Sequence, residues 1–145
     1  MAGSDNMIDF TGCKVALIHK DQMVCIQRDD TPGLRFAGMW DLPGGGRENN
    51  ETPAECAHRE VYEELRMIIP ASSIHYEKVY PAMIDPNQTA YFLAASVTQE
   101  QIDSIVFGDE GQGWKLMTIE EFMSLDNAVP DLRQRLADYL SYIEK

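Results

Sequence analysis

The stretch LPGGGRENNETPAECAHREVYEELRM, residues 42–67, decides the fold, because it joins a glycine run, a helix start and a group of acids. Within it, Thr52 is followed by Pro53 and, three residues after Thr52, by Glu55. This arrangement is a capping box with proline at the first helical position. The sequence therefore predicts that a helix begins directly after Thr52.

The register of this helix separates an apolar stripe from an acidic face. Residues three and four apart are neighbours on a helix, so the apolar stripe and the acidic face fall on different sides. The stripe consists of Ala57, Val61 and Leu65, and the acidic face of Glu60, Glu63 and Glu64. Such a face is either a solvated surface or a site for a hard divalent cation such as magnesium, which takes oxygen ligands.

The glycine run favours the cation site over the solvated surface. Gly44, Gly45 and Gly46 stand between a short apolar segment and the helix start. Glycine permits positive φ and close approach of the backbone to a ligand, and a bare carbonyl could add a metal oxygen. A plain tight turn is the other interpretation of the same glycines.

The complete spacing resembles the Nudix box of the Nudix hydrolase family, and the flanking sequence is similar to its MutT-type branch. Gly45 is followed by five residues, Glu51, seven residues, and then REVYEE at 59–64. The resemblance implies an α/β fold, an α/β/α sandwich with a mixed sheet. Arg66 stands where the family usually has glycine, so a left-handed helix cap would cost roughly 1–2 kcal/mol, or the helix ends differently.

The resemblance also implies an activity and a set of site residues. The family hydrolyses a nucleoside diphosphate linked to another group, with Mg²⁺ or Mn²⁺ as the cofactor. The implied metal ligands are Gly44, Glu60, Glu63, Glu64 and Glu110, and the implied catalytic residues are Glu63, Glu60, Arg59 and Glu110. Arg59 would pair with Glu51 or Glu60, and Glu63 would hold metal or water. Which glutamate takes the proton is left open, because carboxylates that share a metal titrate together.

Three residues before the box are candidates for substrate binding. Arg28 and Arg35 could clamp phosphate, since a guanidinium binds phosphate bidentately, or could balance Asp29, Asp30 or Asp41. Trp40, like Phe36, could stack on a base or pack in the core. The base itself is left open: the MutT-type branch reads it with an asparagine two residues before the last-helix proline, where alignment on Pro130 puts Ala128.

The resemblance to the Nudix hydrolase family leaves several functions open. A nucleoside triphosphate is the first choice of substrate, and ADP-ribose or another nucleotide conjugate is the second, since Pro81 lies near the position of an ADP-ribose signature. A Nudix-fold module that binds a nucleotide without cleaving it is an alternative of another class, as is a purely structural acidic domain. The acids of the box argue against the module, and the glycines argue against the structural domain.

The whole chain predicts one domain, residues 1–145, with a net charge of −12 and a pI near 4.5. Without a basic stripe, a nucleic-acid duplex is excluded as a partner, whereas a small nucleotide is not. Cys13, Cys25 and Cys56 are odd in number and lack ligand spacing, which indicates reduced, buried thiols in a cytoplasmic protein. We expect no signal peptide or membrane span, and a homodimer is left open.

The remaining elements follow from periodicity and turn signals. Strands are expected at 14–20 and 23–28 as a hairpin, at 73–80 and 89–97 as a long antiparallel pair, and at 114–117. A short helix is expected within 98–106, and a capping box at Thr118 and Glu121 predicts another. Pro130 opens the last helix, with Leu132, Leu136, Leu140 and Ile143 facing the core.

Overall fold

The central strand, β1 (Gly12–His19), joins the two halves of the sheet. In the computed structural model, which describes residues 9–144, Val15, Ala16 and Leu17 of this strand are fully buried. β1 pairs antiparallel with β2 (Gln22–Gln27) and parallel with β6 (Thr89–Ser96). β1 ends at His19 and β2 begins at Gln22, and the two strands pair antiparallel. The expected hairpin of the first two strands is therefore confirmed.

The other strands extend this centre into a seven-stranded mixed sheet with the order β3-β2-β1-β6-β5. β5 (Ile74–Pro81) pairs antiparallel with β6, as the sequence predicts. β3 (Trp40–Asp41) and β7 (Gly113–Thr118) pair with β2, and β4 (Gly44–Gly46) pairs with β1. The one parallel pair among these antiparallel pairs makes the sheet mixed.

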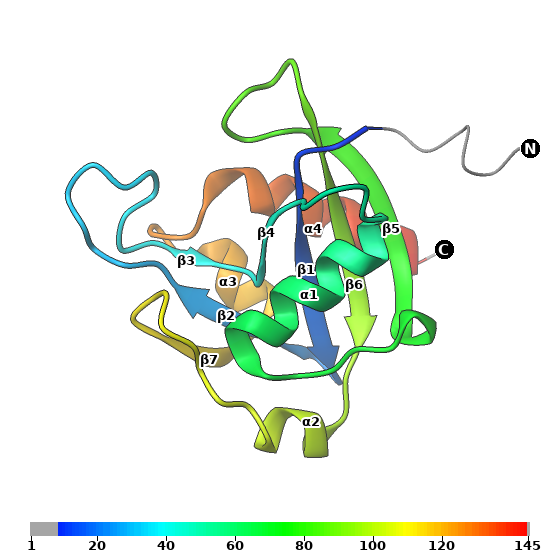
Figure 1. Cartoon of the computed structure of the whole chain (residues 1–145). Coiled ribbons are helices and arrows are strands. Elements are labelled where there is room, and N and C mark those ends of the chain that lie inside the picture. The colour runs from blue at the N-terminus through cyan, green and yellow to red at the C-terminus, as the bar shows by residue number, and fades with distance from the viewer. Residues whose placement is uncertain (1–8, 145) are drawn as a thin grey trace, which may run out of the picture.

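Helices cover both faces of the sheet and complete the α/β/α sandwich (Figure 1). On one face lies α1 (Pro53–Leu65), whose buried Ala57, Val61 and Leu65 pack in one core cluster. On the other face lie α3 (Ile119–Ser124) and α4 (Pro130–Ile143), which pack in a second cluster. The short helix α2 (Gln99–Asp103) connects β6 to β7, and a 3₁₀ turn (Ala71–Ser73) connects α1 to β5.

The sheet opens between β1 and β2, and this opening positions the site. The two strands pair directly only at Ile18 with Met23 and at His19 with Gln22. Further along, β1 pairs instead with β4, and β2 pairs instead with β3. The segment from Asp41 to Gly44 therefore crosses between the separated strands, and it brings the glycine run beside α1.

Two expectations from the sequence are corrected by the structure. The glycine run forms the short strand β4 rather than a turn, because its backbone pairs with Gly12, Cys13 and Lys14 of β1. Ile143 does not face the core: 50% of its surface is exposed at the last turn of α4. The helix cap at Arg66 keeps the left-handed conformation, with φ 56°, despite the missing glycine.

The three cysteines, Cys13, Cys25 and Cys56, are free and buried, as expected from their number and spacing. Within the part of the chain that the structure describes, no helix has the length and apolar character needed to cross a membrane.

Candidate active site

The acidic face of α1 lies directly against strand β4. The predicted capping box is formed, since Thr52 Oγ1 accepts from the Glu55 N–H and Glu55 Oε1 accepts from the Thr52 N–H. This cap fixes the helix register. The Gly44 N–H then donates to Glu64 Oε1 at 2.9 Å. The acids of the helix and the glycines of the strand therefore form one wall.

Two glycines of β4 lie where an added Cβ would meet other atoms. Gly44 has φ 142°, and a Cβ there would clash with the carbonyl oxygen of Cys13 on β1. At Gly45, a Cβ would lie 2.5 Å from Glu60 Oε1. The absent side chain thus leaves the space that the Glu60 carboxylate occupies, which gives the glycines of the box a packing reason.

Arg59 ties the acids together. Its Nε donates to Glu51 Oε2 at 2.7 Å and its Nη2 to Glu51 Oε1 at 3.0 Å, a bidentate pair. Its Nη1 contacts Glu60 Oε2 at 2.9 Å and Glu63 Oε1 at 3.3 Å, and its Nη2 also donates to the Gly46 carbonyl. The sequence left open whether Arg59 pairs with Glu51 or Glu60, and the structure shows that it pairs with both.

These contacts leave the acids in different electrostatic states. The hydrogen bonds from Arg59 lower the pKa of Glu51. Burial raises the pKa of Glu60, and it raises the pKa of Glu64 to about 8, although the Gly44 N–H and the Lys14 charge oppose the rise. Glu63 is more open, with 53% of its side chain exposed. Glu60 and Glu64 are thus carboxylates whose charge the protein does not fully neutralise.

This donor set fits a hard divalent cation, because it offers carboxyl oxygens in a partly buried position whose ionised form a bound cation would stabilise. In residues 9–144, no three His, Cys, Asp or Glu side chains stand in a ready-made cluster for a metal ion. Magnesium in nucleotide sites is typically held by one or two carboxylates together with waters and substrate phosphates. The residues therefore suit an ion that arrives with, or is completed by, a phosphate substrate.

Glu110 comes to the same place from a loop far along the chain. A cavity of about 180 Å³ is lined by both Glu64 and Glu110, together with Gly44 and Lys14. The loop is tied to the segment directly after β2, because the Gly111 N–H donates to Asp29 Oδ2 at 3.2 Å and Gln112 Nε2 donates to the Arg28 carbonyl at 2.9 Å. The structure thus brings Gly44, Glu64 and Glu110 to one cavity, whereas Glu60 and Glu63 are not among the described residues that line it.

Lys14 and Asp41 were missed as site residues by the sequence analysis. Asp41 is only 4% exposed, and its Oδ2 accepts from Lys14 Nζ at 3.0 Å and from Arg28 Nη1 at 3.1 Å. Lys14 lines the cavity with Glu64 and also a second cavity of about 360 Å³. The available sequence signal was Lys14, a charged residue beside an otherwise apolar strand. A position at the end of a strand explains such a residue equally well.

The second cavity gathers candidate substrate residues of the loop between β2 and β3 beside strand β4. Arg28, Arg35 and Phe36 line it with Gly45 and Gly46. Arg35 Nη2 donates to the Met83 carbonyl at 3.0 Å, and its guanidinium lies 4.8 Å from the centre of the Phe36 ring. The alternative interpretation of Arg28, balance of a nearby aspartate, is also realised, since it pairs with Asp41.

Trp40 is placed differently from these residues. Its ring packs against the core cluster beneath α3 and α4, and Lys115 of β7 lies 5.4 Å from the ring centre. Among the described residues, the lining of the two cavities does not include Trp40.

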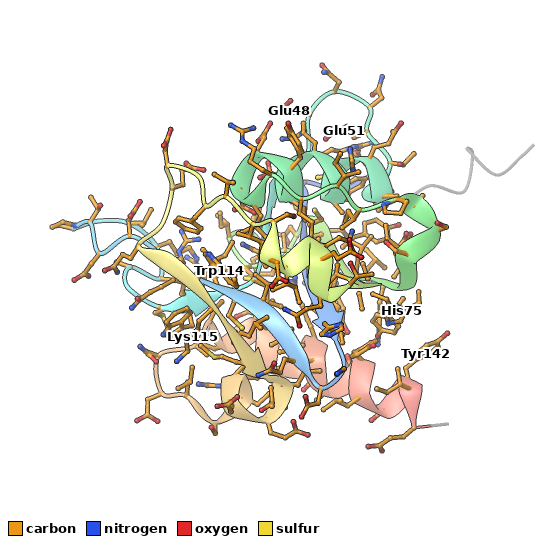
Figure 2. The ribbon with its side chains drawn as sticks, turned by 90° about the horizontal axis from the view of Figure 1, so that it is seen from below. Glu48, Glu51, His75, Trp114, Lys115 and Tyr142 are labelled. Atoms are coloured by element: carbon orange, nitrogen blue, oxygen red, sulfur yellow. The ribbon has the colours of Figure 1, made fainter. Side chains whose placement is uncertain are left out.

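A larger cavity, of about 680 Å³, lies elsewhere, between β5 and α4. His75 and Tyr142, which line it, lie close to α4 in Figure 2, on the side away from Glu48 and Glu51. It contains none of the acids of α1. The assignment of the site therefore rests on the chemistry of the residues rather than on cavity size.

An α/β/α sandwich with acids and glycines packed together beside a cation-lined cavity defines a class of phosphate-handling protein. A model of the NUDIX domain matches residues 13–139, so the chain belongs to the NUDIX domain family. Human diphosphoinositol polyphosphate phosphohydrolase 3-alpha is 27% identical over 114 residues, which cover 77% of this chain and 63% of that protein. The chain thus spans less than two thirds of that curated relative.

Two solved structures show the same fold. One is the MutT protein from Methanosarcina mazei Go1, with 16% identity, a TM-score of 0.72, and coverage of 97% of this chain and 99% of that chain. The other is a bifunctional NMN adenylyltransferase/ADP ribose pyrophosphatase from Francisella tularensis, complexed with AMP and a Mn ion. It has 21% identity and a TM-score of 0.71, and the match covers 94% of this chain and 42% of that chain.

Proposed function

We propose that this protein is a divalent-metal-dependent hydrolase of a nucleoside diphosphate linked to another group. Our first choice of substrate is a nucleoside triphosphate. The observation that carries the proposal is the position of Glu64 and Glu60. Both are buried enough for their pKa to rise, and both pack on the glycines of β4 beside cavities lined by Lys14 and Arg28. Acids and cations adjoin here as a metal-bound phosphate chain requires.

The acids of the proposed site would bind the metal, and Arg59 would position them. Glu60, Glu63, Glu64 and Glu110 would hold Mg²⁺ or Mn²⁺ together with the Gly44 carbonyl. When bound, the cation would neutralise negative charge on the phosphoryl oxygens during attack by water. Arg59 would position the acids, since its guanidinium already contacts Glu51, Glu60 and Glu63. Glu63, the most open of the three helix acids, would hold metal or the attacking water.

Cations on the other side of the cavity would bind the phosphate chain. Arg28 and Arg35 would contact its oxygens, and Lys14 would lie between the acids and these arginines. Asp41 would hold Lys14 and Arg28 in place, because its buried carboxylate contacts both. Trp40 has no part in this proposal, because it lines neither cavity and its partly buried ring packs against the core cluster.

ADP-ribose or another conjugate is the second candidate substrate. The Francisella neighbour is named as an ADP ribose pyrophosphatase, and the human relative as a phosphohydrolase of diphosphoinositol polyphosphates. These names widen the set of substrates that a test must include.

The test is chromatographic detection of cleavage products, with magnesium. The expected products are pyrophosphate or phosphate from nucleoside triphosphates, phosphate from a diphosphoinositol polyphosphate, AMP and ribose 5-phosphate from ADP-ribose, and two nucleotides from dinucleoside polyphosphates. We expect the nucleoside triphosphates to give the highest kcat/KM. Faster cleavage of another compound would replace the substrate and keep the enzyme. Nucleotide binding without cleavage of any of these compounds would instead make the protein a binding module.

A further inference from the structure

Arg135 is a charged residue in a place where charge is costly. It lies on α4, and only 3% of it is exposed. Its Nη2 donates to the Pro81 carbonyl at 3.1 Å, and its guanidinium lies 4.9 Å from the centre of the Tyr80 ring. Burial lowers the pKa of this guanidinium. The side chain is thus held firmly, but mainly by a neutral carbonyl and an aromatic ring.

The protein supplies little compensation for this buried cation. A guanidinium carries five N–H donors, and a buried charge is destabilising unless it is paired and hydrogen-bonded. Within residues 9–144, Arg135 forms no ion pair, although Asp131 and Asp41 are near enough to favour its charged form. Asp41 already serves Lys14 and Arg28. A leucine or methionine would fill the same helix position at lower cost if packing were the only requirement.

Arg135 also lines the cavity of about 360 Å³ that begins at the glycine strand. Gly45, Gly46 and Lys14 line it as well, together with Met83 and Ile84 from the loop between β5 and β6. α4 and α1 lie on opposite faces of the sheet (Figure 1), so Arg135 reaches the cavity from the opposite face to the acids of α1. A ligand whose diphosphate lay at the acids could extend toward Arg135.

The other cations of the cavity already have partners. Lys14 and Arg28 share Asp41, and Arg35 donates to the Met83 carbonyl. Ile84 is 80% exposed and Phe36 is half-buried, so apolar surface is available beside them for a planar or apolar group. Arg35 is exposed, so water can satisfy its remaining donors. Arg135 is instead a buried cation of this cavity with one hydrogen bond and, within residues 9–144, no ion pair.

We propose that Arg135 is a specificity-determining residue that binds a pair of acceptor oxygens or nitrogens on the part of the substrate beyond the cleaved diphosphate. This inference rests on the proposed function. The planar fork of arginine matches two kinds of acceptor pair, phosphate oxygens or the keto-bearing edge of a nucleobase such as guanine. Either group would supply hydrogen-bond acceptors that the protein itself does not provide to Arg135.

The experiment measures equilibrium binding by calorimetry, with magnesium, so that hydrolysis is not needed. The probes are the non-hydrolysable α,β-methylene analogues of GTP and ATP, and inorganic tripolyphosphate. The variants are Arg135→Gln, which removes the charge, and Arg135→Lys, which keeps the charge but loses the fork. Arg133→Gln is the matched control, since Arg133 lies on the same helix but does not line the cavity.

If Arg135 reads a base, Arg135→Gln and Arg135→Lys should both weaken binding of the GTP analogue about 10- to 100-fold, while tripolyphosphate binding stays unchanged. If it binds phosphate, Arg135→Gln should weaken all three probes, and Arg135→Lys should restore part of the loss. Melting temperatures of all variants identify any loss that comes from unfolding.

Two results would overturn the inference. One is wild-type affinity of a folded Arg135→Gln for every probe, or a loss no larger than that of Arg133→Gln. The other is a wild-type protein that binds none of the probes. Tight, Arg135-dependent binding without hydrolysis of the natural triphosphates would support the inference while refuting the proposed enzyme, so the two failures are distinguishable.

Discussion

Replacing Glu64 by glutamine should lower turnover and, in the metal-free protein, raise stability. Glutamine keeps the shape of the side chain, and its Oε1 can still accept the hydrogen bond that the Gly44 N–H donates at 2.9 Å. The change removes the negative charge that the proposed metal site needs. The same charge is costly when no cation is present, because burial raises the pKa of Glu64 to about 8.

The size of the stability change follows from that pKa. An unfolded glutamate ionises near 4.5, whereas folded Glu64 ionises near 8. Between these values the folded state holds a proton that the unfolded state has released, so stability falls as pH rises through this window. Each pH unit costs roughly 1.4 kcal/mol, which sets an upper limit of about 3 kcal/mol at pH 7. Because the side chain borders a cavity, we expect Glu64→Gln to gain about 1–2 kcal/mol.

The assay compares thermal unfolding in excess chelator at pH 5 and pH 7.5 with turnover in magnesium. The gain in melting temperature should be larger at pH 7.5. Turnover should fall by about 100-fold or more, since the bound ion contributes several kcal/mol of transition-state stabilisation. The control is Glu55→Gln, because Glu55 caps the same helix and glutamine also serves a capping box. That variant should change little.

Two outcomes would refute this reasoning. Small and equal losses of turnover from both variants would mean that the acidic face of α1 is only a solvated surface. A Glu64→Gln protein that melts below wild type in chelator would mean that contacts with Lys14 and Gly44 already stabilise the charge.

Three further predictions test the metal, the glycine strand and the helix cap. Excess chelator should abolish turnover, and added Mg²⁺ or Mn²⁺ should restore it; full activity in chelator would exclude a metal role. Gly45→Ala should lower turnover about 10-fold or more, because the added Cβ would lie 2.5 Å from Glu60 Oε1. Gly46→Ala should be tolerated, because the nearest atom to a Cβ there is 3.9 Å away. Arg66→Gly should raise the free energy of unfolding by about 0.5 kcal/mol, because relief of the left-handed strain exceeds the lost contact with the Tyr62 ring. Arg66→Ala should instead lower it, and calorimetric unfolding with an unchanged kcat would check both.

The sequence by itself determined the elements that depend on near neighbours. The helix after Thr52, its capping box and its apolar stripe are formed as predicted, because these interactions join residues three or four apart. The left-handed cap at Arg66 is one of the two helix ends that the sequence left open. The hairpin of β1 and β2 and the pair of β5 and β6 were likewise readable from alternation and turn residues.

The tertiary structure alone decided which distant residues meet. Glycines favour turns by propensity, yet Gly44–Gly46 form a strand because β1 offers its open edge to them. Ile143 matched the apolar face of α4 but lies exposed at its last turn, since the helix extends past the sheet that it covers.

The same limit applies to the site. Lys14 beside Asp41, Glu110 beside Glu64, and Arg135 at the cavity are contacts between segments far apart in the chain. Local pattern carries no information on such pairs, because the split of the sheet between β1 and β2 and the packing of helices on its two faces set their distances. The sequence thus determined the acids and their register, and only the folded sheet decided which cations, loops and buried charges surround them.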